Sequence, residues 1–464
     1  MQPKQFTSLA YKSIDEFIYG SCPNPVVCKN GMVIGGGTVY PEINFTLPNM
    51  QVTNDTLTEV LETYYDIITG VLTKAHELHA PGVVVEYETL PEFTYNPTWG
   101  IQVHRILRDT MNEFEAKHGL KSVIRMTPND VREFNRPPIM RSGRYFNNML
   151  EVFDTTAKDG ADILSIESTG GKEINDEAII NVDLKTSVFA LGVLGARDMS
   201  FLWQHISNIA RANGVISGGD SACGFANTAM VLAERKYIPK VFAAVMRTMV
   251  TPRALVALEY GAIGPSKDCA YENLYLKAIT GTPISMEGKS AACAHFSPIG
   301  NIAAACTDLW SNESVQQVKL LSGFATEVSM EQLVYDCRLM NKAAEKGQAR
   351  FFRDLLTESD CYLDPQAYVL RPDVAFKIAE EVVKTPDAFS RTVNVARATL
   401  EILNDAVKNK ELNIDEREMK YIDILRDQLD EIPEDEAEFS REMINEIDDD
   451  KFIPEEYGFT KLYV

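Results

Sequence analysis

The chain has 464 residues, of which 45% are hydrophobic and 24% charged, and its formal net charge is −22. This composition is that of a globular protein, and a chain of this length can fold stably without disulfide bonds. The negative charge and the lack of a basic stripe argue against a nucleic-acid partner held by phosphate contacts. More than half of the negative excess lies in residues 401–464, which carry 21 acidic and 8 basic side chains.

The sequence predicts a cytoplasmic protein without a membrane partner. The opening residues lack the apolar core of a secretory signal, and no uncharged apolar run reaches the roughly 18 residues typical of a membrane span. The eight cysteines do not show the spacing of a disulfide framework. We therefore expect reduced thiols.

The hydrophobic pattern predicts an irregular start, a helix over 55–79, and then strands alternating with helices. The predicted strands cover 83–88, 122–127, 161–167, 188–195, 214–218, 254–258, 283–287 and 324–328. The predicted helices cover 99–117, 144–158, 198–212, 224–236, 270–279, 299–309 and 330–346.

Eight strands alternating with helices over about 260 residues predict an α/β fold of the (β/α)8 TIM-barrel type, whose usual size is roughly 250 residues. A doubly wound open sheet is the alternative, because alternation alone implies only parallel strands. We predict an N-terminal extension (1–80), a catalytic barrel (81–346) and a helical, acidic C-terminal region (347–464). The acidic end is interpreted as a solvated surface, with a partner contact as the alternative.

Catalytic groups of such barrels lie at the C-terminal ends of the strands. Glu167 ends a predicted strand there, and Cys223 and Cys269 lie in polar, glycine-containing loops that follow two others. Lone cysteines are usually buried hydrophobes, but these two lie beside the acids Asp220 and Asp268. Two thiolates and one carboxylate form a credible catalytic zinc set with an open fourth position.

Such a zinc site would carry a net charge of about −1, which suits binding an alcohol or thiol better than generating hydroxide. This argues against a zinc hydrolase. Cys293 and His295 compete for a ligand role, and Asp220 and Glu86 are candidate proton donors. We expect Glu86 and Glu88 to point to opposite faces of their strand. Serine-hydrolase, P-loop and dinucleotide-binding motifs are absent from the sequence.

Several sequence blocks resemble the zinc-containing subunit of methanol:corrinoid methyltransferases, and the likeness covers nearly the whole chain. The blocks are NPTWG (96–100), GADILSIESTGGKE (160–173), GGDSAC (218–223), GPSKDCAYEN (264–273), KAITGTPISMEGK (277–289) and EEYGF (455–459).

The resemblance implies a barrel that holds one Zn²⁺ per chain through positions corresponding to Glu167, Cys223 and Cys269. It also implies methanol as methyl donor and a corrinoid protein whose Co(I) cobalamin accepts the methyl group at the barrel mouth. It further implies a homodimer within a hetero-oligomer. Two alternatives stay open: another small alcohol, methoxylated compound or methylated thiol as the donor, or a non-catalytic subunit that docks the corrinoid protein.

Overall fold

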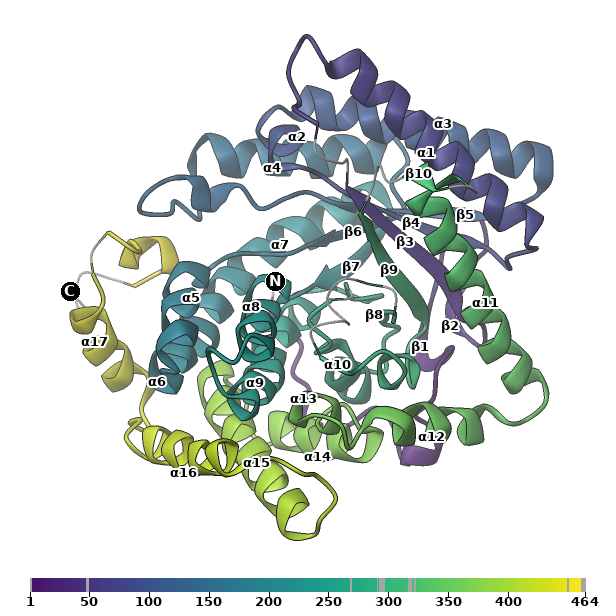
Figure 1. Cartoon of the computed structure of the whole chain (residues 1–464). Coiled ribbons are helices and arrows are strands. Elements are labelled where there is room, and N and C mark those ends of the chain that lie inside the picture. Colours follow the sequence, from purple (N-terminus) through teal and green to yellow (C-terminus); the bar gives the residue numbers. More distant parts are fainter. Residues whose placement is uncertain are drawn as a thin grey trace.

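A curled sheet of seven parallel strands lies at the centre of the protein, surrounded by helices (Figure 1). The computed structural model describes residues 2–46, 50–267, 269–289, 291, 297–315, 319–320, 323–448 and 450–459. Neighbouring strands follow the order β7-β6-β5-β4-β3-β9-β8. The strands are β3 (Tyr40–Thr46), β4 (Val83–Glu88), β5 (Ser122–Thr127), β6 (Ile163–Ile166), β7 (Ile216–Asp220), β8 (Ser285–Glu287) and β9 (Leu309–Val315).

Residues 263–266 join the two edge strands of this sheet. The backbone N–H groups of Ile263 and Gly264 donate to carbonyls of β7, at 2.7 and 2.9 Å. Ser266 pairs in parallel with Ile284, immediately before β8. Hydrogen bonds on both sides of this irregular segment give the sheet its TIM-barrel-like form, so the predicted α/β barrel class is confirmed.

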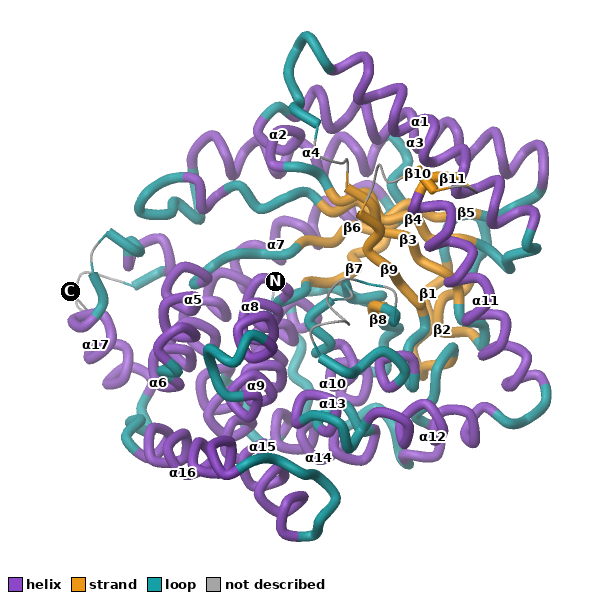
Figure 2. Tube along the Cα trace, viewed as in Figure 1, coloured by secondary structure: helices purple, strands orange, loops and turns teal. Residues whose placement is uncertain are grey.

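Helices cover the outside of the sheet, as the purple tubes around the orange strands show (Figure 2). Those within the barrel region are α1 (Leu57–Glu77), α2 (Pro91–Tyr95), α3 (Pro97–His118), α4 (Gly143–Lys158), α5 (Lys172–Asn181), α6 (Leu184–Val188), α7 (Ala196–Asn213), α8 (Cys223–Glu234), α9 (Lys240–Glu259), α10 (Asn273–Thr280) and α11 (Ala325–Glu345). The later helices are α12 (Ala349–Asp360), α13 (Pro365–Tyr368), α14 (Pro372–Val383), α15 (Ala388–Lys408), α16 (Glu416–Asp430) and α17 (Glu436–Glu446).

Three predicted strands are wrong, because these segments are helical. Residues 189–195 form a π-helix that leads into α7, residues 254–258 are the end of α9, and residues 325–328 begin α11. The first two are buried on every side and show no polar face. A short apolar run without periodicity does not distinguish a strand from a buried helix.

The sequence pattern does not predict β3 or β9, because polar side chains interrupt their apolar runs. It does not predict segment 263–266 either, because Gly264 and Pro265 are typical of turns. Glu42 and Asn44 on β3 are buried, as are Ser311 and Asn312 on β9. Since β3 belongs to the sheet, the predicted boundary at residue 80 is wrong, and the barrel begins near residue 40. The predicted helix over 299–309 contains only a short 3₁₀ turn before β9.

A buried ion pair ties the barrel interior together. Arg125 and Glu42 are both fully buried, with Nε of Arg125 2.6 Å from Oε1 of Glu42. Arg125 also donates to the hydroxyl oxygen of Ser165 (2.9 Å) and to the carbonyl oxygen of Pro265 (2.8 Å). The pair thereby links β3, β5 and β6 to the segment that completes the barrel.

The N-terminal hairpin of β1 (Ser21–Val27) and β2 (Val33–Gly36) covers the N-terminal ends of the barrel strands. Its apolar side chains form one cluster with the early residues of five strands. The cluster contains Val26, Cys28, Met32, Ile34, Val84, Val123, Ile163, Ile216 and Leu309. This end of the barrel is therefore packed, and its opposite end is the place to seek a site.

Helix α9 is enclosed by the C-terminal helices. It is long and apolar enough to cross a membrane, but residues 241–259 lie buried within the protein. Helices α13, α15 and α16 pack against it (Figure 1). The C-terminal region is helical as predicted, and its packing is continuous with that of the barrel.

The buried histidine of α3 makes stability depend on pH. His104 is fully buried, and burial, with the nearby charge of Arg108, lowers its pKa to about 4. The unfolded chain binds a proton below about pH 6.5, so the native state loses stability as the pH falls from about 6.5 to about 4. Wild type should therefore lose free energy of unfolding between pH 7 and pH 5, and we expect His104→Gln to make this loss smaller by about 2 kcal/mol. Urea titrations at the two pH values measure it.

The exposed His79 offers the control for this experiment. His79 has a φ of 54°, a conformation that asparagine tolerates. His79→Asn should leave the pH dependence of wild type unchanged. If His104→Gln and wild type lost the same free energy of unfolding between pH 7 and pH 5, His104 would not be the cause of the pH dependence.

Candidate metal centre

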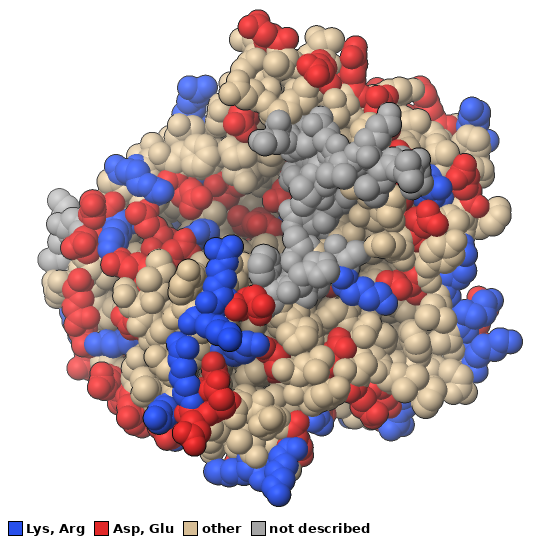
Figure 3. Space-filling model, viewed as in Figure 1, with Lys and Arg blue, Asp and Glu red and all other residues tan. Residues whose placement is uncertain are grey.

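A cavity of about 170 Å³ lies at the C-terminal ends of the strands. Residues at the end of β4 and β5, those that follow β5 and β6, and the start of α8 line it. They are Glu88, Thr127, Pro128, Asn129, Asp130, Glu133, Glu167, Ser168, Thr169, Lys172 and Gly224. On the face shown in Figure 3, acidic side chains gather around a hollow. The cavity therefore has an acidic wall at the end of the barrel where catalytic groups belong.

Three predicted metal ligands come together beside this cavity, whose lining includes Glu167. Glu167 follows β6, Cys223 begins α8 directly after β7, and Cys269 follows the segment that completes the barrel. One carboxylate oxygen and the two sulfurs all lie within 4.8 Å of one another. Sγ of Cys269 lies 3.3 Å from Oε1 of Glu167. The structure thus brings together the three residues that the strand-end argument selects.

The structure joins Cys223 and Cys269 as a disulfide, with their Cα atoms 5.4 Å apart. This differs from the thiols expected from the sequence. The free cysteines among the described residues are Cys22, Cys28, Cys306, Cys337 and Cys361. Thiolates, not disulfide sulfurs, bind metals, so the form able to hold a metal is the reduced one.

The donor set fits zinc. Two thiolates and one carboxylate leave a fourth position for an exchangeable ligand, as in catalytic zinc sites. A tetrahedral zinc separates its donor atoms by roughly 3.5–4 Å. Sγ of Cys269 already lies 3.3 Å from Oε1 of Glu167, and reduction of the disulfide would let the two sulfurs move apart to this spacing. Nδ2 of Asn227 donates a hydrogen bond to the sulfur of Cys223 at 3.0 Å. The competing candidates Cys293 and His295, and Asp268, lie outside the described residues.

Lys267 brings positive charge to the acidic side of the site. Its Nζ lies 2.8 Å from Glu167 and 3.2 Å from both Glu86 and Glu88. Thr127 donates a further hydrogen bond to Glu86 at 2.7 Å. The expectation that Glu86 and Glu88 face opposite sides is wrong, because side chains two residues apart on a strand share a face.

Asp220 lies beneath the Glu167 loop, at 1% exposure. Its carboxylate accepts hydrogen bonds from Nε1 of Trp203 (3.1 Å) and from the backbone N–H of Ser168 (3.4 Å), and it pairs with Arg253 (3.3 Å). Burial raises the pKa of Asp220, and the charge of Arg253 opposes that rise. These contacts give the carboxylate a positioning role, and its use as a proton donor stays a prediction.

A second buried network supports the same loop. Arg132 forms paired hydrogen bonds with Asp130 and with Asp198, and all three side chains are fully buried. Oδ2 of Asp130 also accepts from the backbone N–H of Thr169, at 2.9 Å. Burial alone would raise the pKa of Asp130, but Arg132 and the Thr169 N–H outweigh it and lower the pKa.

Glu272 links the two segments that carry the cysteines. It lies three residues after Cys269 and accepts a hydrogen bond at 2.9 Å from the backbone N–H of Ala222, the residue before Cys223. Burial raises the pKa of Glu272 to about 7. The carboxyl therefore fixes the spacing of the two cysteine-bearing loops.

Sequence reasoning did not select Lys267, Glu133 or Asn227. Lys267 lies two positions before Cys269 and directly after segment 263–266. A prediction that placed this segment in the barrel would have selected Lys267 as a strand-end residue. Glu133 lines the cavity, and burial beside Asp130 raises its pKa. Asn227 follows Cys223 by four residues on α8, so one helical turn brings its amide to the sulfur.

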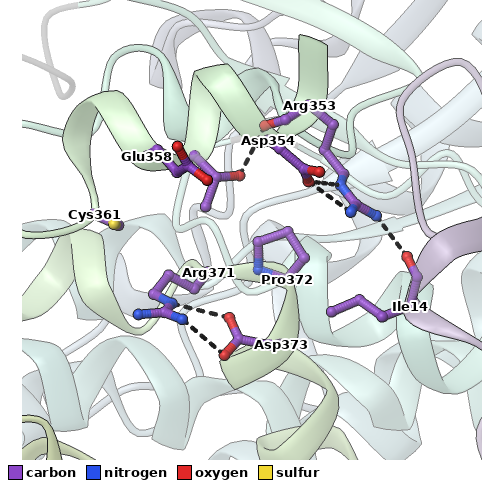
Figure 4. Close-up of a pocket in the computed structure, with 9 residues that line it drawn as sticks. Ile14, Arg353, Asp354, Glu358, Cys361, Arg371, Pro372 and Asp373 are labelled. Carbon is purple, nitrogen blue, oxygen red and sulfur yellow. Dashed lines mark hydrogen bonds and ion pairs between the residues drawn. The ribbon is translucent and has the colours of Figure 1, made fainter. Parts of the chain in front are cut away.

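A second cavity, of about 210 Å³, lies outside the barrel between α12, α14 and the N-terminal segment. Both of its arginines are already paired (Figure 4). Arg353 contacts Asp354, and Arg371 contacts Asp373. The positive charges of this cavity are therefore already neutralised within the protein.

Comparison with known proteins agrees with the family resemblance. Residues 3–458 match the family model described as methanol-cobalamin methyltransferase B subunit. The chain is 36% identical over 466 residues to a methanol–corrinoid protein co-methyltransferase from Methanosarcina barkeri (strain Fusaro / DSM 804), covering 99% of this chain and all of the relative.

A solved structure has the same fold. The chain superposes on the methanol:cobalamin methyltransferase complex MtaBC from Methanosarcina barkeri with a TM-score of 0.93 and 36% identity, covering 98% of this chain and all of the matched one. Sequence and fold agree over essentially the full length of both relatives. The chain is a methyltransferase and belongs to the family of methanol-cobalamin methyltransferase B subunits.

Proposed function

We propose that the chain binds one Zn²⁺ through Glu167, Cys223 and Cys269 and uses it to transfer the methyl group of methanol to the corrinoid of a partner protein. The convergence of these three side chains, beside the cavity that Glu167 lines, carries the proposal. Family membership supports the methyl transfer, since the matched relative is named for methanol and a corrinoid protein.

Hydroxide is a poor leaving group, so cleavage of the C–O bond of methanol needs stabilisation of charge on the departing oxygen. Zinc, when bound, would supply a Lewis acid for that oxygen. Lys267 lies against Glu167 and balances the negative charge of the ligand set. The Glu272–Ala222 hydrogen bond holds the two cysteine-bearing segments at a fixed separation.

The departing oxygen also needs a proton, and we propose Glu86 or Asp220 as its source. Glu86 is the better placed, since it contacts Lys267 within the cluster that includes Glu167. Glu86→Gln should lower kcat by about 100-fold and remove an ionisation from the kcat profile against pH. A profile identical to wild type would assign the proton transfer to another group.

The volume of the cavity favours a small donor. About 170 Å³ corresponds to roughly five or six water molecules in the liquid. With reduced, zinc-loaded protein and the corrinoid partner, methanol should form methyl-corrinoid at least about ten times faster than ethanol, methanethiol or a methoxylated aromatic compound. Faster transfer from another compound would identify that compound, and not methanol, as the methyl donor. A protein that binds the corrinoid partner without zinc and without methyl transfer would be a docking subunit.

We further propose that the chain acts in the cytoplasm, as a homodimer joined to the corrinoid protein over the barrel mouth. The reduced cysteine pair that zinc requires is consistent with a reducing compartment. Light scattering of the chain alone and with the partner tests this assembly. A mass of one chain under both conditions would contradict it.

A further inference from the structure

The loop that follows Glu167 is held by groups from distant parts of the chain. Arg253 on α9 donates to the carbonyl oxygen of Ser168 at 2.6 Å. Asp130, after β5, accepts from the backbone N–H of Thr169 at 2.9 Å. Both Arg253 and Asp130 are buried, at 0% and 2% exposure. They fix the first two residues after the candidate ligand.

A third contact comes from the end of the chain. The backbone N–H of Gly171 donates to the phenol oxygen of Tyr457 at 3.1 Å. Gly171 precedes α5 and has a φ of 82°, and a Cβ at this position would lie 2.6 Å from the carbonyl oxygen of Ala190. Close packing and a buried N–H that needs an acceptor leave this end of the loop little freedom.

Residues 452–459 are packed into the protein around this contact. Tyr457 is 2% exposed, and Phe452 and Phe459 are each 3% exposed. Oε2 of Glu456 accepts from the backbone N–H of Arg141 at 2.7 Å. The guanidinium of Arg197 lies over the ring of Phe459, 4.3 Å from its centroid. The last described residues of the acidic end thus pack their aromatic side chains into the protein, whereas Glu455 stays exposed.

We propose that Tyr457 is a positioning residue for the metal centre: through Gly171 it holds the loop that aims Glu167 at the two cysteines. The inference rests on the proposed function, because it requires Glu167 to be a metal ligand. Burial raises the pKa of Tyr457, so the side chain stays a neutral phenol at physiological pH. Groups behind metal ligands commonly change metal affinity by about 10- to 100-fold when they are removed.

Tyr457→Phe removes the acceptor oxygen and keeps the buried ring. Tyr368→Phe is the matched control, because Tyr368 is also buried and donates one hydrogen bond, to Glu411 at 2.6 Å, outside the metal centre. Zinc dissociation constants are measured on the reduced full-length proteins by competition with a chromophoric chelator. We expect Tyr457→Phe to weaken zinc binding about 10-fold and Tyr368→Phe to stay within about twofold of wild type.

Amide hydrogen exchange of the metal-free proteins provides a second readout. Tyr457→Phe should speed exchange in the peptide over 167–172 at least about 10-fold, and Tyr368→Phe should not. The inference would be overturned if Tyr457→Phe bound zinc as tightly as wild type. It would also be overturned if Tyr457→Phe and Tyr368→Phe weakened zinc binding equally. If wild type binds no zinc, the proposed function fails instead, and exchange still shows whether Tyr457 anchors the loop.

Discussion

Replacing either Cys223 or Cys269 by alanine is expected to abolish zinc binding and methyl transfer together. Each variant leaves one sulfur and one carboxylate, too few ligands to hold a catalytic zinc. Loss of the Lewis acid removes several kcal/mol of charge stabilisation from the departing oxygen, so the rate should fall by about 1,000-fold or more. Plasma emission counts the metal in reduced, dialysed protein, and absorbance of methylcobalamin follows the transfer.

Cys337→Ala controls for the loss of a buried thiol. Cys337 is a fully buried free cysteine on α11, away from the cavity. This variant should keep about one zinc per chain and most of the activity. One full equivalent of zinc in both Cys223→Ala and Cys269→Ala would show that these residues are not the ligands.

Arg132→Met is expected to cause the largest loss of stability among the substitutions considered. Arg132 pairs with Asp130 and Asp198, and all three side chains are fully buried. Methionine keeps much of the volume but leaves two carboxylates buried without their cation, a change that typically costs about 3–5 kcal/mol. Urea titration at pH 7 measures the difference in free energy of unfolding between the variant and wild type. A difference below about 1 kcal/mol would contradict this description of the network.

The same substitution should weaken zinc binding, because Asp130 holds the Thr169 N–H of the Glu167 loop. Arg105→Met is the matched control. Arg105 lies 2.7 Å from Asp159, but 55% of its side chain is exposed. Exposed ion pairs contribute about 0–1 kcal/mol, so this variant should unfold and bind zinc like wild type.

The barrel class was predictable from the sequence, whereas the identity of its strands was only partly so. Strands β4, β5, β6 and β7 have apolar runs that stand out against their helices. Strands β3 and β9 contain buried polar residues such as Glu42 and Asn312, which interrupt the pattern. The predicted count of eight strands was reached only because three helical segments, two of them fully buried, were taken for strands.

The three candidate metal ligands could be selected from the sequence because each is a chemically distinctive residue just after a strand or predicted strand. Their positioning partners were not, since Tyr457 and Arg253 are brought to the loop by tertiary packing. Tyr457 is 290 positions from Glu167 in the chain. Such contacts depend on the folded arrangement of the C-terminal region, which periodicity does not specify.

X-ray absorption at the zinc K-edge of the reduced, zinc-loaded protein tests the central claim most directly. We predict two sulfur scatterers at about 2.3 Å and oxygen or nitrogen scatterers at about 2.0–2.2 Å. Addition of methanol should change the oxygen shell and leave the sulfur shell unchanged. A shell without sulfur, or one with four sulfurs, would contradict a zinc centre built from Glu167, Cys223 and Cys269.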